Sequence, residues 1–564
     1  MLTNSAIAGA LGAAFLTVLV LQLNPQIPLM SATTARWYLT LAILYGLPLA
    51  VVFYLLMVAK EFFSMSPISP AWVSVRVLAW LAAGSAAVAA LLMWLNVEGF
   101  AAALPPAAAR RMTAGAIATG VAAGGLFVVA AAHYSSGRRG SRVGAALFVI
   151  AMFGSVALPV AARGPAVIPA KHVRSRPAVT TVSRTIDSGP RVRMILLDGA
   201  SLDYIWPRAS EGRLPNFARL LDAGASMDIA TVRPTAPDPV WAAAATGVYP
   251  ARNGVRSAAA YYALGDDRTI DLLPDHCFSH ALVQIGLVRD VPNTSAAWQA
   301  RPLWSILSDA GIRSGIVRWP LTFPVEPIDG FVVSDRFHAV AGVTSDLDDQ
   351  AVFPAALLPI ARTGLEQGAA TVGVRRSAET RDRLYARVMD LLRARDDVRF
   401  SAVRFQGLDA FGHAYIKYAQ ARPEDVAGQG AEAGADALDR YYAFIDTDVG
   451  RALDQQRPGD LLLVVSGFGM QRQNIAKEWL ARLLSGDAVT GTHERAPEGF
   501  LLAYGEDVAP GRHKRGSIVD VAPTVLYYLG LPMGRDMDGF ARVDLFTPRF
   551  TAERPIAFIG SYGR

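Results

Sequence analysis

The chain of 564 residues contains one cysteine, Cys277, and only eight histidines. A single cysteine excludes an intrachain disulfide, a cysteine-based zinc site and a Cys-x-x-Cys redox pair. The chain has no nucleic-acid-binding motif, and we therefore assign its net charge of +6 to membrane topology and contact with anionic lipid head groups. It shows no internal repeat, and it is too long for one domain.

Charged residues are scarce in the first third of the chain. Hydrophobic residues make up 52% of the whole sequence, and the mean hydropathy is +0.28. Five apolar runs are each near the roughly 20 residues that a bilayer span needs. The predicted spans are about Leu2–Leu23, Tyr38–Ala59, Val77–Val97, Thr113–Tyr134 and Val143–Ala162. The first run is unlike a signal peptide, because no basic segment precedes it and four more runs follow.

The arginines between the spans predict the orientation of this bundle. Arg138, Arg139 and Arg142 favour a cytoplasmic N-terminus by the positive-inside rule, although the basic residues at 163–176 argue the other way. An odd number of spans then places the C-terminal domain on the opposite side. We expect a multi-pass protein of the cell membrane with an extracytoplasmic (periplasmic) C-terminal domain.

The hydrophobic pattern of the sequence changes after a proline-rich linker at residues 164–190. Short apolar runs alternate with amphipathic helices over residues 191–564, which predicts a mostly parallel sheet with helices on both faces. The fold class is thus an α-helical transmembrane bundle (1–163) joined to an α/β domain. The predicted strands are Arg191–Leu197, Ile312–Trp319, Val398–Gln406, Asp460–Val465 and Phe500–Tyr504. The predicted helices are Pro215–Ala223, Ser377–Arg395, Leu438–Leu453 and Ile518–Leu529, and Ala427–Ala435 is expected to be an exposed loop.

Asp198, Asp409 and Ser466 lie just past the ends of three of these strands, where ligands gather in such sheets. Asp409 and His413 stand four residues apart, and His493 follows later in the chain. Carboxylate and imidazole are zinc ligands, and catalytic zinc sites use three protein ligands with an open position. The alternative is a helix-capping Asp409 with incidental histidines. Asp198 is a fourth candidate ligand, or a turn carboxylate that uses the adjacent Gly199.

Two other pairs of polar residues are interpreted as having no part in a functional site. Asp335 and His338 are expected at the surface, and His276 and His280 in a partly buried segment.

The order of the motifs adds a resemblance to a known family. The motifs are Ile195–Gly199, Pro234–Trp241, Ala245–Pro250, Asp409–His413, Leu461–Met470, Gly491–His493 and Asp520–Thr524, which leads to Leu529–Pro532. With these motifs, about Arg191–Gly539 resembles the alkaline phosphatase superfamily, and most closely its type I phosphodiesterase / nucleotide pyrophosphatase branch. The resemblance implies two zinc-like ions that flank a Thr or Ser nucleophile.

Residue by residue, the resemblance matches Asp409, His413 and His493 to the ligands of one ion. It matches Asp198 to one ligand of the other ion. The metal set expected from the resemblance is therefore complete for the first ion and has one ligand of four for the second.

The remaining positions depart from the family pattern. The nucleophile position falls on Pro237, the missing Asp-His ligand pair on Gly467 and Phe468, and the phosphoryl-binding Asn near Ala258. The second ion is therefore expected to be lost, leaving one divalent metal, a zinc.

A shifted nucleophile is one way to compensate for Pro237. Thr235 is the candidate, and the alternative is that its hydroxyl stabilises a turn. A single-metal hydrolase that activates a water is a further alternative. Asp238 is expected to cap the helix that contains Trp241.

These observations predict a membrane-anchored, metal-dependent phosphoester hydrolase with a phosphoester or lipid head-group substrate. The alternatives are a non-catalytic binding or scaffold relative and a lipid or envelope phosphotransferase. The last is suggested by topology, because five spans before such a domain resemble phosphoethanolamine transferases and lipoteichoic acid synthases. No nucleic-acid-binding module is expected.

Overall fold

The structure is a computed structural model that divides into two units by its internal contacts. One unit comprises Met1–Lys171 with Ala259–Pro292, and the other comprises His172–Ala258 with Asn293–Arg564. The structure describes residues 1–63, 75–135, 142–166, 189–263, 265–274, 282–283, 285–340, 349–369, 378–419, 429–475, 478, 489–493 and 497–563. Cys277, His276 and His280 lie outside these residues, as does most of the predicted linker.

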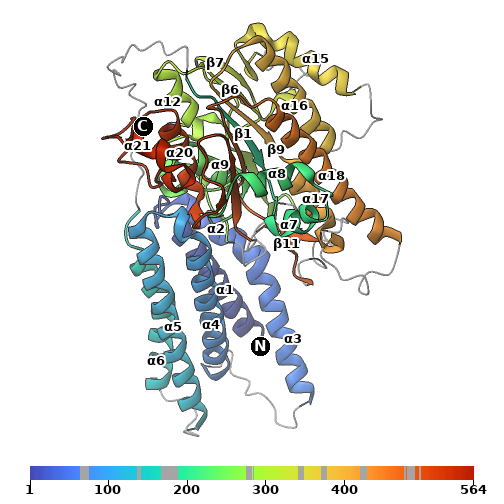
Figure 1. Cartoon of the computed structure of the whole chain (residues 1–564). Helices are drawn as coiled ribbons and strands as arrows, with labels where there is room; N and C mark the ends of the chain where they lie inside the picture. The colour runs from blue at the N-terminus through green and yellow to red at the C-terminus, as the bar shows by residue number, and fades with distance from the viewer. Residues whose placement is uncertain are drawn as a thin grey trace. The chain divides into compact units, whose positions relative to one another are not determined.

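The first unit is a bundle of long helices (Figure 1), in which α4 packs against α5 and α5 against α6. Its helical elements are α1 (Leu2–Leu23), α2 (Ala32–Leu41), the π-helical turn η1 (Ala42–Gly46), α3 (Leu47–Phe63), α4 (Val75–Phe100), the 3₁₀ turn η2 (Ala101–Ala103), α5 (Pro106–Ser135) and α6 (Arg142–Arg163). Proline at 106, the first residue of α5, suits a helix start, where the amide hydrogen has no intrahelical acceptor.

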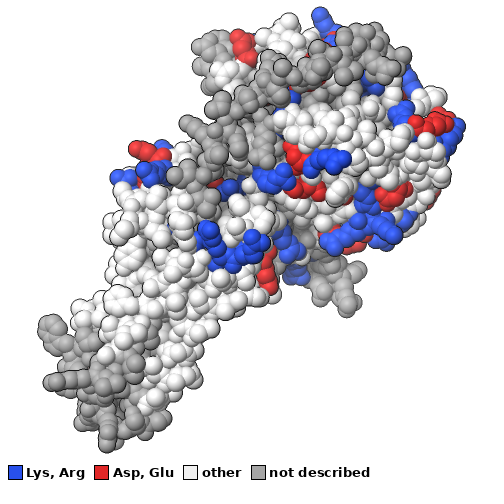
Figure 2. All heavy atoms as spheres, turned by 90° about the vertical axis from the view of Figure 1, so that its left-hand side faces the viewer, with Lys and Arg blue, Asp and Glu red and all other residues white. Residues whose placement is uncertain are grey.

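Four helical stretches of this unit are long and apolar enough to cross a membrane: Leu2–Leu23, Ala32–Phe63, Leu78–Ala103 and Pro106–Ala132. They coincide with the first four predicted spans and indicate a membrane protein. On the face shown in Figure 2 the surface of these helices is largely free of charged side chains. The fifth predicted span falls on α6, whose side chains are described only in part. The five-span count and the orientation therefore stay predictions.

A three-stranded antiparallel sheet also belongs to the first unit. It consists of β3 (Ala259–Ala263), β4 (Thr269–Ile270) and β5 (Val288–Pro292), in the order β4-β3-β5. The sequence analysis had placed these residues in the C-terminal domain, but by contacts they group with the helices. Apolar side chains from α1, α2 and this small sheet share one buried cluster.

Asn24, the residue after α1, joins the helices to this insertion. Its side-chain amide donates to the carbonyl of Leu272 at 2.8 Å, and its side-chain oxygen accepts from the backbone amides of Asp271 at 2.9 Å and Leu272 at 3.1 Å. Arg36 adds an ion pair to Asp266 at 3.1 Å. Because Asn24 is fully buried, these bonds are shielded from water.

The second unit is built on a sheet in the order β14-β2-β13-β10-β1-β9-β6-β7-β8, with β15 also paired to β2. The strands are β1 (Val192–Leu197), β2 (Ala225–Ala230), β6 (Ser314–Val317), β7 (Gly330–Val333), β8 (Val352–Phe353), β9 (Phe400–Phe405), β10 (Leu461–Ser466), β13 (Gly499–Tyr504), β14 (Gly511–Arg512) and β15 (Gly516–Ser517). Two small ladders join β11 (Gln471–Arg472) to β12 (Gly491–Thr492), and β16 (Met533–Gly534) to β17 (Phe558–Ile559).

The sheet is mixed, which corrects the prediction of a mostly parallel sheet. Five neighbouring strands from β10 to β7 are parallel, whereas β13 runs antiparallel to both β10 and β2, and β8 runs antiparallel to β7. The prediction failed because β13 is buried almost throughout. A continuous apolar run is typical of parallel strands and carries no information on direction.

Helices cover both faces of this sheet, as predicted. Their bounds are α7 (Leu202–Ser210), α8 (Pro215–Ala223), α9 (Pro237–Thr246), α10 (Pro250–Asn253), α12 (Leu303–Asp309), α13 (Phe337–Val340), α15 (Leu358–Ala369), α16 (Ala378–Arg395), α17 (Gly407–Ala419), α18 (Gln429–Asp454), α20 (Val521–Tyr528) and α21 (Pro548–Glu553). Short 3₁₀ turns are η4 (Ser295–Ala297), η5 (Ala355–Leu357), η7 (Ile518–Asp520) and η8 (Val543–Leu545). The expected loop at Ala427–Ala435 is wrong for the residues from Gln429 onward, which begin α18.

The core of the second unit has two halves, one on each face of the sheet. Met194 and Leu196 of β1 face a cluster with α9, α12 and α20, while Ile195 and Leu197 face a cluster with α8, α16 and α18. This alternation follows from the two-residue period of a strand. It also fixes which helices can reach the end of β1, where Asp198 follows.

We expect Asn24→Ala to destabilise the first unit by about 1–3 kcal/mol, because it leaves the backbone amides of Asp271 and Leu272 buried without their acceptor. Thermal unfolding of the purified full chain in detergent measures this loss. Met30→Ala is the control, since Met30 is 100% exposed in the same connection. Equal melting temperatures for the two variants would contradict the role given to Asn24.

Candidate metal centre

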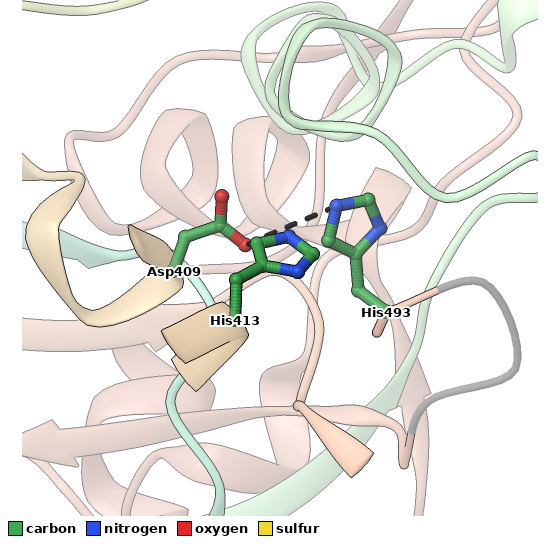
Figure 3. A group of neighbouring side chains, drawn as sticks. All are labelled: Asp409, His413 and His493. Atoms are coloured by element: carbon green, nitrogen blue, oxygen red, sulfur yellow. Dashed lines mark ion pairs between the residues drawn. The ribbon is translucent and has the colours of Figure 1, made fainter. Parts of the chain in front are cut away.

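Asp409 and His413 lie on α17, which begins two residues after β9 ends. Their four-residue spacing places both side chains on one face of the helix. His493 directly follows β12, which packs against α17. Figure 3 shows the three side chains converging from these two segments, as the sequence predicts.

The ligand atoms of this cluster lie close together but do not bond one another. The Nε2 atom of His413 is 3.6 Å from Oδ1 of Asp409, and Nε2 of His493 is 3.9 Å from the same oxygen. One potential ligand atom from each residue falls within 4.8 Å of the others. The imidazole rings meet at 70° with their centroids 5.1 Å apart.

A backbone carbonyl fixes the tautomer of His413. Its Nδ1 lies 2.8 Å from the carbonyl oxygen of Gly491, which can only accept, so Nδ1 carries the hydrogen. The Nε2 atom then carries the free lone pair, and it lies 3.6 Å from Oδ1 of Asp409. Such a second hydrogen bond is usual for a metal-binding histidine and orients its ring.

The cluster fits a zinc-like ion. Oδ1 of Asp409 is buried and has no hydrogen-bond partner among the described residues. A buried oxygen in this state is costly, by about 1–3 kcal/mol or more for a charged group. Donors around a tetrahedral ion with bonds of about 2.0 Å stand roughly 3.3 Å apart. The two distances from Oδ1 of Asp409, 3.6 and 3.9 Å, are somewhat longer than that value.

Burial controls the protonation of the cluster. It raises the pKa of Asp409, while the neighbouring His413 and His493 oppose this shift. Burial also lowers the pKa of His493, against the charge of Asp409 and a weaker contribution from the backbone of Thr235. Neutral imidazole is the form that binds a metal, so the lowered pKa of His493 favours binding near neutral pH.

Asp198 has a different partner from the one that the sequence analysis considered. Its buried carboxylate receives Nε of Arg404 at 3.1 Å on both oxygens and Nη2 at 2.5 Å, and the indole of Trp241 at 2.6 Å. Asp198 is 0% exposed and Arg404 is 4% exposed. Its acceptor capacity is thus largely used by protein donors, and it is not part of the three-residue cluster.

The place expected for an Asp-His ligand pair is filled by apolar atoms. A Cβ added to Gly467 would lie 2.3 Å from Cγ1 of Val240, so no side chain fits there without moving α9. Phe468 is fully buried, and its ring centroid is 5.1 Å from that of His493. Gly467 and Phe468 thus lie among apolar side chains and supply no metal ligand.

Residues at the start of α9 differ in part from expectation. Thr235 is buried, and its hydroxyl donates to the carbonyl of Val232 at 3.0 Å, which is the turn alternative. The predicted helix cap at Asp238 is wrong, because Ala236 is the residue before the helix and no side chain caps it. Pro237 is the first helical residue, and Asp238 lies within the first turn.

Asp238 instead joins a group of charges near Arg404. Burial raises the pKa of Asp238 to about 7, Arg404 opposes this shift, and Asp335 and Asp198 reinforce it. Asp335 is half-buried, where the sequence analysis expected a surface residue, and accepts from the hydroxyls of Ser334 at 3.1 Å and Thr322 at 3.3 Å. His338 contacts the hydroxyl of Tyr385 at 2.9 Å.

Arg404 is the residue that the sequence analysis missed. It is the fifth residue of β9, a strand whose other side chains are apolar or small and all buried. An arginine at an inward position of a buried strand is rare unless it is paired, and that was the available signal.

One comparison with known proteins finds a family. The sequence model for the type I phosphodiesterase / nucleotide pyrophosphatase family matches residues 192–499, more than half of the chain. That range contains Asp198, Arg404 and the three converging side chains. A comparison with curated proteins gives no match.

We expect the purified full chain, equilibrated with zinc and desalted, to retain about one ion per chain, as three convergent ligands imply. His413→Ala should reduce retained zinc to background, because it removes one of three ligands. His513→Ala is the matched control, since His513 contacts the carbonyl of Ala509 away from the cluster. Elemental analysis measures the content, and two tightly held ions would contradict a single site.

The raised pKa of Asp238 predicts how stability depends on pH. The native carboxyl keeps its proton up to a pH of about 7, whereas an unfolded Asp loses it near 4, so stability falls as pH rises between these values. Asp238→Asn should therefore raise the melting temperature more at pH 8 than at pH 4.5. Asp203→Asn, in the exposed first turn of α7, should show far less pH dependence. An equal effect of Asp238→Asn at both pH values would rule out the raised pKa.

Proposed function

Because the chain belongs to the type I phosphodiesterase / nucleotide pyrophosphatase family, we propose that it is a membrane-anchored phosphoester hydrolase that uses one divalent ion, zinc. Asp409, His413 and His493 are its ligands in this proposal. The observation that carries the proposal is the buried Oδ1 of Asp409, which has no hydrogen bond from any residue that the structure describes and has two imidazole nitrogens within 4 Å.

The side chains of the cluster are already oriented for binding. The bond between His413 and the Gly491 carbonyl holds one ring, and α17 holds Asp409 on the same face as His413. When bound, a zinc ion supplies Lewis-acid charge to a phosphoryl oxygen and lowers the pKa of a bound water. The protein's part is to hold three ligands and leave the fourth position open.

Arg404 is proposed to replace the second ion as the counter-charge of Asp198. In the family resemblance, Asp198 corresponds to a ligand of a second ion. Here the guanidinium of Arg404 binds that carboxylate through both of its oxygens and neutralises it without a metal. This pairing needs no metal and no ligand pair at Gly467 and Phe468.

Water is the proposed nucleophile. Pro237 has no hydroxyl, and the hydroxyl of Thr235 donates within its own turn. Thr235 remains the candidate for a shifted nucleophile, because its backbone influences His493 and therefore lies at the site. Replacement of Thr235 by valine, which has the same shape, separates these two mechanisms.

The substrate proposed is a phosphoester at the membrane, either a soluble ester outside the cytoplasm or a lipid head group. The apolar helices support the membrane location. Phosphoester chemistry is the part that family membership supports. The extracytoplasmic side follows from the distribution of arginines between the predicted spans.

A non-catalytic role is the second candidate, and one observation favours it. A side chain at position 467 would collide with Val240, so this position has no room for a ligand to a second ion. A domain of this kind could retain one ion for structure and bind ligands without turnover.

An assay of the full chain on an aryl phosphodiester and an aryl phosphomonoester, with added zinc or manganese, tests the proposal. We expect turnover that His493→Ala lowers by at least about 100-fold, the scale of losing several kcal/mol of charge stabilisation. Thr235→Val should keep most of the activity, and His513→Ala should keep all of it.

Three results would count against the proposed mechanism. Turnover that persists in His493→Ala at the wild-type rate would place the chemistry elsewhere. Retained zinc with no turnover on either ester would favour the non-catalytic candidate. Loss of activity in Thr235→Val alone would identify a hydroxyl nucleophile in place of water.

A further inference from the structure

The helical unit contains a polar hollow at the ends of α1, α5 and α6. It is lined by Gln22, Pro25, Ala108, Arg111, Met112 and Arg163, and it is open to the surface. Three of these six residues carry strong hydrogen-bond donors. All six belong to one unit, and none is part of the candidate metal centre.

Arg163 is buried in this hollow with no acidic partner among the described residues. Its guanidinium donates to the carbonyls of Leu21 at 2.8 Å, and of Asn24 and Pro25 at 3.2 Å each. The side chain is 4% exposed, and its Nη1 has no hydrogen-bond partner in the described part of the chain. Backbone carbonyls satisfy donors but do not cancel the charge, and buried charges are normally paired.

Gln22 and Arg111 add unused donors to the same place. Both polar atoms of Gln22 are buried without a partner among the described residues. Nη1 of Arg111 makes one long hydrogen bond, 3.4 Å, to the carbonyl of Arg163. Arg111 too forms no ion pair within the residues that the structure describes. Two guanidinium groups and one amide thus surround a small space to which no described residue brings a counter-charge.

The sequence offers few acids that could neutralise these arginines. Glu61 and Glu98 are the only acidic residues before Asp187. Glu98 is exposed and accepts from the indole of Trp94 at 3.2 Å. Asp266 of the insertion is already paired with Arg36. An anion from outside the protein therefore completes the charge balance best.

We propose that this hollow binds a phosphate group, with Arg111, Arg163 and Gln22 as its donors. Guanidinium groups match the oxygens of phosphate in charge and in geometry. The hollow lies at helix ends, where lipid head groups meet a membrane protein. The phosphate is therefore that of an anionic phospholipid, with free inorganic phosphate as the other source of the same chemistry.

Native mass spectrometry of the full chain in detergent tests this site. After delipidation, we expect one phosphatidylglycerol to bind with at least tenfold preference over phosphatidylcholine. Arg111→Gln should weaken this binding about tenfold, as the loss of one charged hydrogen bond implies. Arg110→Gln is the matched control, because Arg110 is the exposed neighbour on the same helix and does not line the hollow. Equal weakening by the two variants would overturn the proposal, as would equal binding of the two lipids.

A competition experiment at constant ionic strength distinguishes the two sources of the phosphate group. If inorganic phosphate displaces the lipid where chloride does not, the hollow takes phosphate from either source. If neither salt displaces it, the bound group is the lipid. If the chain retains neither phosphatidylglycerol nor phosphate, the proposal is wrong.

Gln22→Leu distinguishes a binding site from a mere packing defect. Leucine has a similar size and removes the two unpartnered atoms, so it should not unfold the bundle. If Gln22 is only a packing defect, Gln22→Leu should not change the rise in melting temperature that phosphatidylglycerol produces. As a donor to phosphate, its replacement should reduce that lipid-dependent rise by more than half.

Discussion

The buried ion pair between Arg404 and Asp198 is the interaction on which the rest of the candidate site depends. Asp198 ends the central strand β1, and Arg404 lies on the neighbouring strand β9. Breaking such a pair leaves one uncompensated charge in the core, at a cost of about 3–5 kcal/mol. Because the pair also receives the indole of Trp241, it fixes α9 against the sheet. Through α9 it determines what surrounds Gly467 and Phe468.

The Arg404–Asp198 pair and the candidate metal centre provide two different kinds of charge in one site. On one side Asp409, His413 and His493 leave a buried oxygen without a partner, which suits an ion that can be exchanged. On the other side Arg404 is a permanent part of the chain. A guanidinium cannot lower the pKa of a water as zinc does, but it holds its charge at every pH that the protein meets. This division is the one we propose for a domain of the phosphodiesterase family in which Gly467 and Phe468 stand where a ligand pair is expected.

The sequence predicted the strands and helices of the second unit well where apolar runs were long. Arg191–Leu197 and Asp460–Val465 were predicted as strands, because the apolar pattern of a strand is a local property. The helix that carries Asp409 and His413 was not predicted, and only their four-residue spacing was noted. Strand direction was not predictable for β13, since burial on both faces looks the same in either direction. Arg404 was missed because its partner lies 206 positions away in the sequence, and only the fold brings the two together. The grouping of Ala259–Pro292 with the helices depends on Asn24 in the same way, through contacts about 248 residues apart.

Anomalous diffraction at the zinc edge, from crystals of the full chain grown with zinc, tests the central claim most directly. The account predicts one strong peak between Asp409, His413 and His493, with Asp198 still bound to Arg404 and no peak beside it. A second peak at Asp198, with Arg404 displaced from the carboxylate, would contradict it.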